Sequence, residues 1–375
     1  MKILLVSLWS ISEESIGGTE KFVVDLARGL SKSHSVTILS LGRMNVAIEN
    51  VTMASLNIVE CLDEYSFAVH LRQKGLVEIS EKLKIFLKDQ TFDVVHCNSL
   101  FFAGLVEGIP TIHTVHTNQE EFKNSFPREI TNSILENVKK DESIAYVVPS
   151  AFAEESFKIL TGKTSTIISH AFVADIELQD KTVIRKIYGI SEDDVVFCLP
   201  SRLEIKQKGQ EILLRALMNI KEKLPPFTVV LGGCDKQYIE NKRYLEKHYS
   251  NLKIVIEAFP TKNDLYSISD VIVLPSKTES FGYAALESTA MGFLVFLSNI
   301  LPYQEIAKGS PRSILFENSE IGLSQILLEH LDEIIAHEIL PPPVQWGERY
   351  SQGLMIQKYL SVYNEKISAF SRCSV

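Results

Sequence analysis

The sequence predicts an α/β protein made of two doubly wound, Rossmann-like parallel sheets. Apolar runs of strand length alternate with amphipathic segments of helix length along the whole chain. Some runs, such as Val271-Ile272-Val273-Leu274, are apolar at every position, which indicates strands buried on both faces of a parallel sheet covered by helices. The alternation starts afresh near residue 194, and 375 residues exceed what one core usually holds. We therefore expect two such domains facing a central cleft.

The elements follow one another in the order that such sheets require. A helix is expected after the first strand, because apolar residues recur at helical spacing over 19–31. The same spacing predicts a helix over 208–223 in the second half. The expected strands are 2–8, 35–41, 92–98, 110–116, 144–150 and 164–170 in the first half, and 194–200, 227–232, 252–257, 270–275 and 294–298 in the second.

The last segment, 346–370, has helical periodicity and is expected to cross back to the first domain. We place the N-terminal domain at residues 1–175 and the C-terminal domain at residues 176–354. The end of the chain, from about 355 to 375, is then a helix that packs back on the N-terminal domain.

The composition favours a globular protein of the cytoplasm. Apolar residues make up 45% and charged residues 23% of the chain, and no run approaches the roughly 18 apolar residues of a membrane span. The apolar start, Met1 to Val6, has no small-residue cleavage site after it, so it indicates a first strand and not a signal peptide. The five cysteines show no Cys-x-x-Cys spacing, which argues against a disulfide framework or structural zinc.

The net charge is acidic, at −9. The first 180 residues hold 16 basic and 24 acidic residues, a balance that fits neither a nucleic-acid-binding protein nor one that docks strongly on anionic lipid. At most, weak peripheral membrane contact remains open through the basic residues of segment 68–88, which are Arg72, Lys74, Lys82, Lys84 and Lys88.

The sharpest motif is a pair of glutamates, Glu279 and Glu287, separated by seven residues. It directly follows an expected buried strand, so it stands at a strand's carboxyl end, where doubly wound sheets bind ligands. Phe281, Gly282 and Tyr283 would open the next helix, whose free N–H groups form an anion site, and the glycine would leave room for a ligand. Carboxylates so placed suit a ligand rich in hydroxyl groups. The alternative is an ordinary capped helix with surface glutamates.

A basic loop follows the expected strand at 194–200. Arg202 supplies a forked donor and Lys208 a point charge, a pair suited to a diphosphate, and Gly209 allows a close approach as the next helix begins. The alternative is a solvated surface loop. Because this loop and the glutamate motif both stand at strand ends of one domain, we expect them to converge.

The N-terminal domain offers weaker signals. Gly17 and Gly18 precede the first helix and either cradle a phosphate or sugar or form a flexible loop, since the full G-x-G-x-x-G of a nicotinamide site is absent. His116 ends the expected strand at 110–116, where it is either a ligand contact or a structural residue. His96 and His113 fit the structural interpretation better.

Together these motifs resemble glycosyltransferase family 4, retaining enzymes of the GT-B fold, over nearly the whole chain. The resemblance rests on the opening strand, Gly-Gly-Thr-Glu and helix, the Arg-x5-Lys-Gly loop, the Glu-x7-Glu motif, and Trp346 to Tyr350 before the last helix. All occur in the family's order. The chain departs from the family after residue 298, where Pro302 and Glu305 are kept but a glycine-rich turn is lost.

The resemblance implies a role for each residue of the C-terminal domain. Arg202 and Lys208 would hold the donor diphosphate and stabilise its charge as it leaves. Glu279 would bind hydroxyl groups of the donor sugar, with help from the backbone N–H groups of Phe281 to Tyr283. Glu287 would bind the ribose hydroxyls of the nucleotide.

From the N-terminal domain, the resemblance implies that His116 contacts the donor sugar near the reacting carbon and that Gly17 and Gly18 close on the phosphates. The implied reaction transfers a hexose or N-acetylhexosamine from a nucleotide-diphosphate sugar to a hydroxyl acceptor, with retained configuration. The departing phosphate would accept the proton, so no covalent nucleophile is needed. No cofactor and no metal are implied, and the sequence contains no Asp-x-Asp.

The donor base and the acceptor are less constrained. UDP is favoured by its frequency within the family, with GDP second. The acceptor would bind to the N-terminal domain, and a small molecule, a glycan, a lipid-linked sugar and a protein side chain all stay open, as does the oligomeric state. A non-catalytic nucleotide-sugar-binding scaffold of GT-B descent and a GT-B nucleotide-sugar epimerase are the alternatives. Because both motifs are retained, a sugar-transferring enzyme is favoured over either.

Overall fold

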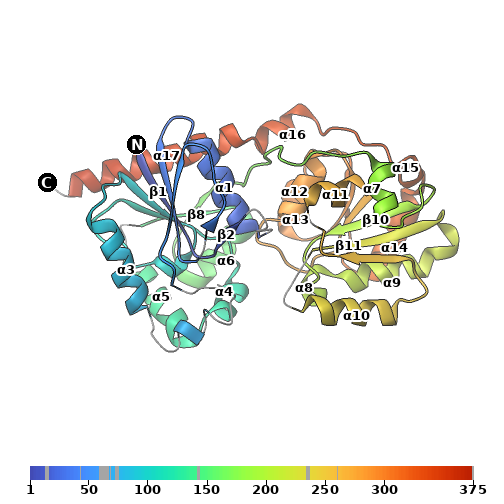
Figure 1. The fold of residues 1–375 in the computed structure, drawn as a ribbon, viewed down its shortest axis with the longest axis horizontal. Helices are drawn as coiled ribbons and strands as arrows, with labels where there is room; N and C mark the ends of the chain where they lie inside the picture. The colour runs from blue at the N-terminus through green and yellow to red at the C-terminus, as the bar shows by residue number, and fades with distance from the viewer. Residues whose placement is uncertain are drawn as a thin grey trace. The chain divides into compact units, whose positions relative to one another are not determined.

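The computed structural model describes residues 1–12, 17–42, 44–58, 67, 69–71, 76–141, 144–233, 237–259 and 261–373. The chain forms two compact units (Figure 1). Unit 1 consists of Met1–Val173 with Tyr350–Val375, and unit 2 consists of Ala174–Arg349. The corresponding predicted boundaries were at 175/176 and 354/355.

Unit 1 is built on a seven-stranded parallel sheet with the order β5-β3-β1-β6-β7-β8-β9. The chain starts in the middle, builds outward to one edge, and then returns to build the other, so the strand order reverses between β1 and β6. This is the doubly wound arrangement. The strands are β1 (Lys2–Ser7), β3 (Ser35–Ser40), β5 (Val51–Ser55), β6 (Val94–Cys97), β7 (Thr111–Thr114), β8 (Ala145–Val148) and β9 (Thr166–Ile167), and a separate pair comprises β2 (Ile11–Ser12) and β4 (Met44–Asn45).

Helices cover both faces of the unit 1 sheet. Leu4 and Val6 of β1 share a core with α3, α5 and α6, so by strand alternation Ile3 and Leu5 face α1 and α17. These last two helices pack side by side, and a Cβ at Gly29 would lie 2.6 Å from Ile356 Cδ1. The helices are α1 (Gly18–Leu30), α3 (Val77–Lys88), η1 (Leu100–Phe102), α4 (Gln119–Ser125), α5 (Arg128–Lys140), α6 (Ala151–Thr161) and α17 (Gln352–Cys373).

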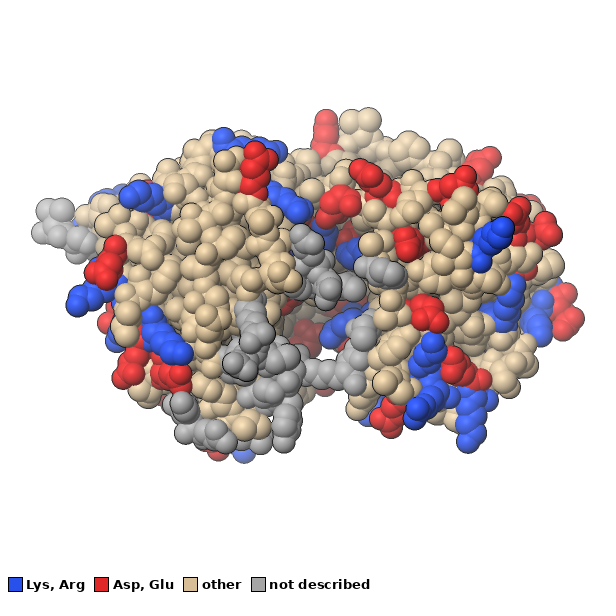
Figure 2. All heavy atoms as spheres, in the orientation of Figure 1, with Lys and Arg blue, Asp and Glu red and all other residues tan. Residues whose placement is uncertain are grey.

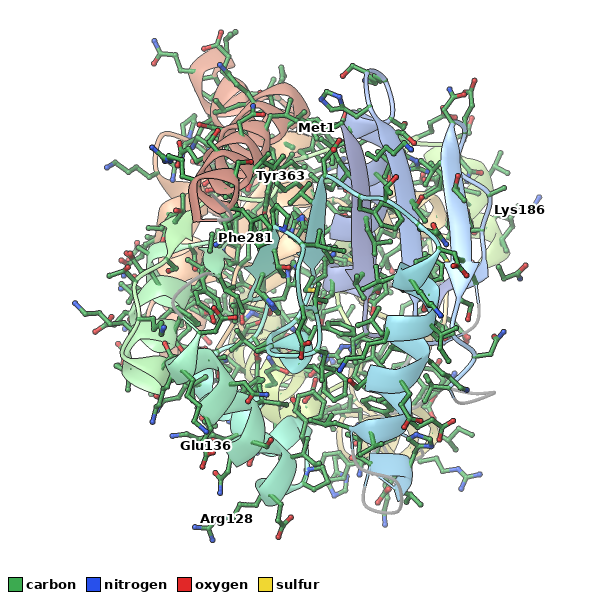
Figure 3. All side chains as sticks on the ribbon, turned by 90° about the vertical axis from the view of Figure 1, so that its left-hand side faces the viewer. Met1, Arg128, Glu136, Lys186, Phe281 and Tyr363 are labelled. Atoms are coloured by element: carbon green, nitrogen blue, oxygen red, sulfur yellow. The ribbon has the colours of Figure 1, made fainter. Side chains whose placement is uncertain are left out.

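A buried polar network fixes α17 to the sheet of unit 1. The two ring nitrogens of His96 lie 2.8 Å from Tyr363 Oη and 2.7 Å from Thr114 Oγ1. Thr114 Oγ1 is in turn 3.0 Å from Tyr359 Oη. Figure 3 labels Tyr363 where α17 runs beside the strands. His96 therefore has both nitrogens satisfied inside the core, which agrees with the structural interpretation from the sequence.

Unit 2 repeats the architecture with six parallel strands in the order β12-β11-β10-β13-β14-β15. The strand order reverses between β10 and β13. The strands are β10 (Val195–Pro200), β11 (Phe227–Gly232), β12 (Ile254–Glu257), β13 (Val271–Leu274), β14 (Leu294–Ser298) and β15 (Ser313–Phe316). The helices are α7 (Lys181–Ile187), α8 (Ile205–Lys208), α9 (Gln210–Ile220), η2 (Lys221–Lys223), α10 (Tyr238–His248), α11 (Lys262–Ser267), α12 (Tyr283–Ala290), α13 (Leu301–Ala307), α14 (Glu320–Glu329), α15 (Leu331–Ala336) and α16 (Val344–Arg349).

The structure confirms the two doubly wound parallel sheets and each predicted strand, and it corrects the end of the chain. The expected helix over 346–370 is two helices, α16 and α17, separated at Tyr350 and Ser351. The backbone leaves the helical conformation there because Tyr350 O accepts a hydrogen bond of 2.9 Å from Phe172 N, and Ser351 forms a parallel bridge with Phe172.

Two surface properties bear on the predicted partners. None of the described helices is both long and apolar enough to cross a bilayer. On the face drawn in Figure 2, acidic and basic side chains are interspersed over each unit, so the described part of this face presents no single-sign surface for a polyanion. Arg72 and Lys74 lie outside the described residues.

Candidate functional site

The two motifs of unit 2 meet at the point where its strand order reverses. β10 and β13 are hydrogen-bonded neighbours, and each connects to a loop at its carboxyl end. The basic loop, residues 201–209, follows β10, and the glutamate loop, residues 275–282, follows β13. Ligands of doubly wound sheets bind in the crevice outside the carboxyl ends of two such strands. The topology therefore brings both motifs to the position where a ligand is expected.

The two loops are tied together by hydrogen bonds to backbone carbonyl oxygens. Lys277 N donates to Gln207 O over 2.8 Å, and Gln207 Nε2 donates to Thr278 O over 3.3 Å. Gly209 has a φ of +73°, and a Cβ at this position would collide with the carbonyl oxygen of Pro275. A glycine is therefore required at this position both for its left-handed backbone and for the close approach of the two loops.

Lys208 and Glu279 form the centre of the site. Lys208 Nζ lies 2.7 Å from Glu279 Oε1, and the two side chains are 11% and 15% exposed. Ser276 Oγ donates to the same carboxylate oxygen over 3.0 Å. An ammonium group and a carboxylate are thus held in contact beyond the carboxyl ends of β10 and β13, where they can offer a positive charge to an anion and an acceptor to a hydroxyl group.

Arg202 lies apart from this pair. Its guanidinium group is 3.3 Å from the Glu204 carboxylate, and the side chain is 52% exposed. The backbone at this point is fixed, because Gln210 Nε2 donates to Arg202 O over 2.8 Å. The structure therefore places Arg202 on the same loop as Lys208, with an exposed side chain paired to a carboxylate of the loop itself.

The start of α12 contains Phe281, Gly282 and Tyr283. Gly282 has a φ of +101°, and a Cβ there would lie 2.6 Å from Cε1 of Tyr303. The space beside Gly282 is thus filled on that side by a ring of the protein, where the sequence suggested room for a ligand. The rings of Phe281 and Tyr283 meet edge to face with centroids 5.8 Å apart; Phe281 is labelled in Figure 3.

Glu287 lies inside α12, away from the Lys208 contact. Its side chain is 2% exposed, and Oε1 is 2.6 Å from Lys262 Nζ. Tyr266 Oη donates to Oε2 over 3.3 Å. Burial raises the pKa of the Tyr266 phenol well above its ordinary value, and the charge of Glu287 adds to this effect. The hydroxyl therefore keeps its proton and stays a donor. Both carboxylate oxygens of Glu287 therefore have donors from the protein.

In unit 1, Gly17 and Gly18 stand at the start of α1, with Gly17 as the extended residue before the helix. Ser15 and Ile16 of the same motif lie outside the described residues. His116 follows β7, and its ring centroid is 4.8 Å from that of Phe22 and 5.2 Å from that of His170.

His116 has a vacant hydrogen-bonding atom. Its Nε2 is buried and has no hydrogen-bond partner within the described part of the chain. Burial lowers the pKa of the His116 imidazole to about 3, so the ring is neutral near pH 7. A neutral ring nitrogen without a partner can still form one hydrogen bond. His113 has Nδ1 2.9 Å from Ser99 O and lies fully inside the core, and its Nε2 likewise has no partner among the described residues.

Sequence reasoning missed four side chains that complete the unit 2 site: Ser276, Tyr303, Lys262 and Tyr266. Tyr303 lies in α13, the helix that follows β14, and Lys262 begins α11 after β12. Both follow carboxyl ends of strands, so the rule that identified the two motifs was the available signal. The described residues contain no group of three or more His, Cys, Asp or Glu that could hold a metal ion.

Two models of known families match the chain in succession. The model described as Glycosyltransferase Family 4 matches residues 16–164, and the model described as Glycosyl transferases group 1 matches residues 180–348. Together they span most of both units. The chain belongs to the family 4, group 1 glycosyltransferases. It is therefore an enzyme of the glycosyltransferase class.

Named relatives agree with this assignment. The chain is 27% identical to an uncharacterized glycosyltransferase of Methanocaldococcus jannaschii, over 82% of this chain and 83% of that protein. It is 24% identical to a D-inositol 3-phosphate glycosyltransferase of Saccharomonospora viridis, over 70% of this chain and 66% of that protein.

Solved structures establish that this glycosyltransferase has the GT-B fold. A sucrose-phosphate synthase of Thermosynechococcus elongatus superposes with a TM-score of 0.78 at 17% identity, over 98% of this chain and 99% of that one. The Anabaena protein HepE, in complex with UDP and glucose, superposes with a TM-score of 0.72 at 15% identity, over 97% and 99% of the two chains.

Proposed function

We propose that this glycosyltransferase moves a hexose or N-acetylhexosamine from a UDP-sugar to a hydroxyl acceptor, with retention of the anomeric configuration and without a metal ion. The observation that supports this best is the contact between Lys208 and Glu279, 2.7 Å long, at the point of strand-order reversal in unit 2. A diphosphate and a sugar hydroxyl are the ligand groups that such a pair suits.

In the proposed reaction the bond between the anomeric carbon and the diphosphate oxygen breaks. The acceptor oxygen bonds to the same carbon on the same face, and its proton passes to the departing phosphate oxygen. The protein contributes positioning and charge stabilisation. Lys208 and Arg202 hold the diphosphate, for which Arg202 is well suited because its side chain is 52% exposed and, among the described residues, pairs with Glu204 of its own loop.

The sugar and the nucleoside are assigned to three further groups. Glu279 accepts hydrogen bonds from sugar hydroxyls, aided by the backbone N–H groups of Phe281 to Tyr283. Glu287 accepts hydrogen bonds from the ribose hydroxyls. These hydroxyls have to displace Lys262 Nζ, and the side chain of Lys262 is 29% exposed. His116 is assigned to the sugar, which is supported by its Nε2 having no partner among the described residues, and Gly17 and Gly18 are assigned to the phosphates.

The preference for UDP draws support from similar structures. HepE is described in complexes with UDP, with UDP and glucose, and with UDP-glucose. The preference for a metal-free reaction rests on the basic groups, because Lys208 and Arg202 supply the positive charge that a metal ion provides elsewhere.

The test is thermal unfolding with UDP, GDP, ADP and TDP and their common sugar conjugates, each with and without EDTA. A ligand at about 100 times its Kd stabilises the folded state by about 2.7 kcal/mol. We expect selective stabilisation by UDP and UDP-sugars that EDTA leaves unchanged. Stabilisation by GDP alone would contradict the donor base, and a requirement for a divalent ion would contradict the metal-free site.

Turnover separates the proposal from its two alternatives. A transferase releases UDP and forms a glycoside whose anomeric proton coupling in NMR matches that of the donor. An epimerase forms a new nucleotide sugar without any acceptor. A scaffold binds the nucleotide sugar and leaves it intact.

A further inference from the structure

Glu279 receives three donors on a single carboxylate oxygen. Besides Lys208 Nζ at 2.7 Å and Ser276 Oγ at 3.0 Å, the phenol of Tyr303 lies 3.4 Å from Oε1. Tyr303 Oη is also 3.1 Å from Ser276 Oγ, so the single proton of the phenol is shared between that hydroxyl and Glu279 Oε1. The described residues give Oε2 no hydrogen-bond partner, so one oxygen of the carboxylate is saturated and the other is left for a ligand.

The two hydroxyl donors are themselves held rigidly. Tyr303 is 1% exposed, and its ring occupies the space beside Gly282, where a Cβ would approach to 2.6 Å. Ser276 O accepts from Ser298 Oγ over 2.6 Å and from Asn318 Nδ2 over 3.1 Å. The support of Glu279 thus extends from β13 to the neighbouring strand β14 and to α13.

The phenol of Tyr303 is a fixed proton donor. Burial, and next the charge of Glu279, raise its pKa well above the ordinary value. Since the ring is locked and the hydroxyl keeps its proton, the hydrogen bond to Glu279 restricts the direction in which the carboxylate points. A carboxylate with one oxygen engaged by neighbours is pre-organised to present the other.

We propose that Tyr303 and Ser276 are positioning residues that occupy one oxygen of Glu279 and direct the other toward a hydroxyl group of the donor sugar. This inference rests on the proposed function, because it needs Glu279 to meet the sugar. It assigns the role of Tyr303 to sugar recognition and not to diphosphate binding. A loss of Tyr303 must therefore affect a nucleotide sugar more than the bare nucleotide.

The experiment compares the affinities of UDP and UDP-glucose by calorimetry in the full chain. We expect Tyr303→Phe, which keeps the ring, to weaken UDP-glucose binding about 3- to 10-fold, the factor of one ordinary hydrogen bond, and to leave UDP binding within about twofold. Ser276→Ala should act in the same direction. If Tyr303→Phe does not fold, Ser276→Ala makes the same test.

Tyr249→Phe is the matched control. Tyr249 is also buried in unit 2 and donates to a glutamate, Glu211, over 3.1 Å, but outside the site. Tyr249→Phe should change neither the affinity for UDP nor the affinity for UDP-glucose. In a Glu279→Ala background, Tyr303→Phe should have no further effect, because its influence passes through that carboxylate.

Two results would overturn the inference while leaving the proposed function intact: UDP-glucose affinity unchanged in Tyr303→Phe, or the same loss persisting without Glu279. An equal loss for UDP and UDP-glucose would also overturn it, since the effect would then not concern the sugar. If the wild-type chain binds none of UDP, UDP-glucose, GDP and GDP-mannose, the proposed function is contradicted. The inference then fails as well, because it needs a bound donor sugar.

Discussion

Replacing Lys208 by alanine tests the centre of the site, and the structure sets the expected size of the effect. The substitution removes the charged partner of Glu279, whose side chain is 15% exposed, and leaves it two hydroxyl donors. Loss of such a partner costs about 1–3 kcal/mol in the free energy of unfolding. For unit 2, with 176 residues from Ala174 to Arg349, this lowers the unfolding temperature by about 2–12 °C.

We expect Lys208→Ala to lose more turnover than its lower stability would cause. A positioned charge that meets the departing diphosphate in a site of low dielectric contributes about 100-fold or more to the rate. The assay follows the release of UDP from a UDP-sugar at a temperature where the variant is fully folded. Turnover should fall by about that factor in Lys208→Ala.

Lys253→Ala provides a matched comparison. Lys253 Nζ lies 2.7 Å from Asp194 Oδ2, the same length as the Lys208 contact, but the pair precedes β12 and β10 and so stands at the opposite ends of these strands. Its turnover should equal that of the wild type. The assignment of the site is refuted if folded Lys208→Ala keeps turnover within about threefold of the wild type, or if both variants lose it equally.

Three further predictions concern the site and the core. Glu279→Ala should also lose about 100-fold in turnover while staying folded, and near-wild-type turnover would contradict its role. Gly209→Ala should lower stability by about 1–3 kcal/mol in thermal unfolding, because of its φ of +73° and the clash with Pro275 O, and should abolish stabilisation by UDP; a stable variant that responds to UDP would disprove the loop geometry. Burial lowers the pKa of His113 from 6.5 to about 4 and that of His116 from 6.5 to about 3. Below pH 6.5 these histidines therefore bind more protons in the unfolded chain than in the folded one, so the stability should fall as the pH drops from 6.5. A flat unfolding temperature between pH 7 and pH 5 would exclude this.

Most of the fold could be predicted from the sequence because its central strands are apolar at every position. β13, for example, is buried along its whole length. The two strands of the main sheets that were missed, β5 and β15, lie at sheet edges. β5 is partly exposed throughout, and its sequence Val-Thr-Met-Ala-Ser lacks a continuous apolar run. An edge strand is half solvated, so periodicity alone does not separate it from a loop.

The sequence predicted which loops of the site lie together, because these loops follow neighbouring strands. Parallel strands place their carboxyl ends at one edge of the sheet, so the loops of Lys208 and Glu279 had to be close. The hydrogen bond between Tyr303 and Glu279 joins residues 24 apart, and the ion pair between Lys262 and Glu287 joins residues 25 apart. Such pairings depend on the twist of the sheet and on side-chain packing, which no local sequence pattern encodes.

The seating of α17 on unit 1 has a consequence for how the protein is made. Unit 1 lacks its last helix until the ribosome has synthesised all 176 residues of unit 2, a delay of about 9–35 s at about 5–20 residues per second. Until then His96 and Thr114 have no Tyr363 and Tyr359 to meet. The first unit to be synthesised is thus the last to be completed, whereas unit 2 is continuous in sequence and can close as soon as it emerges.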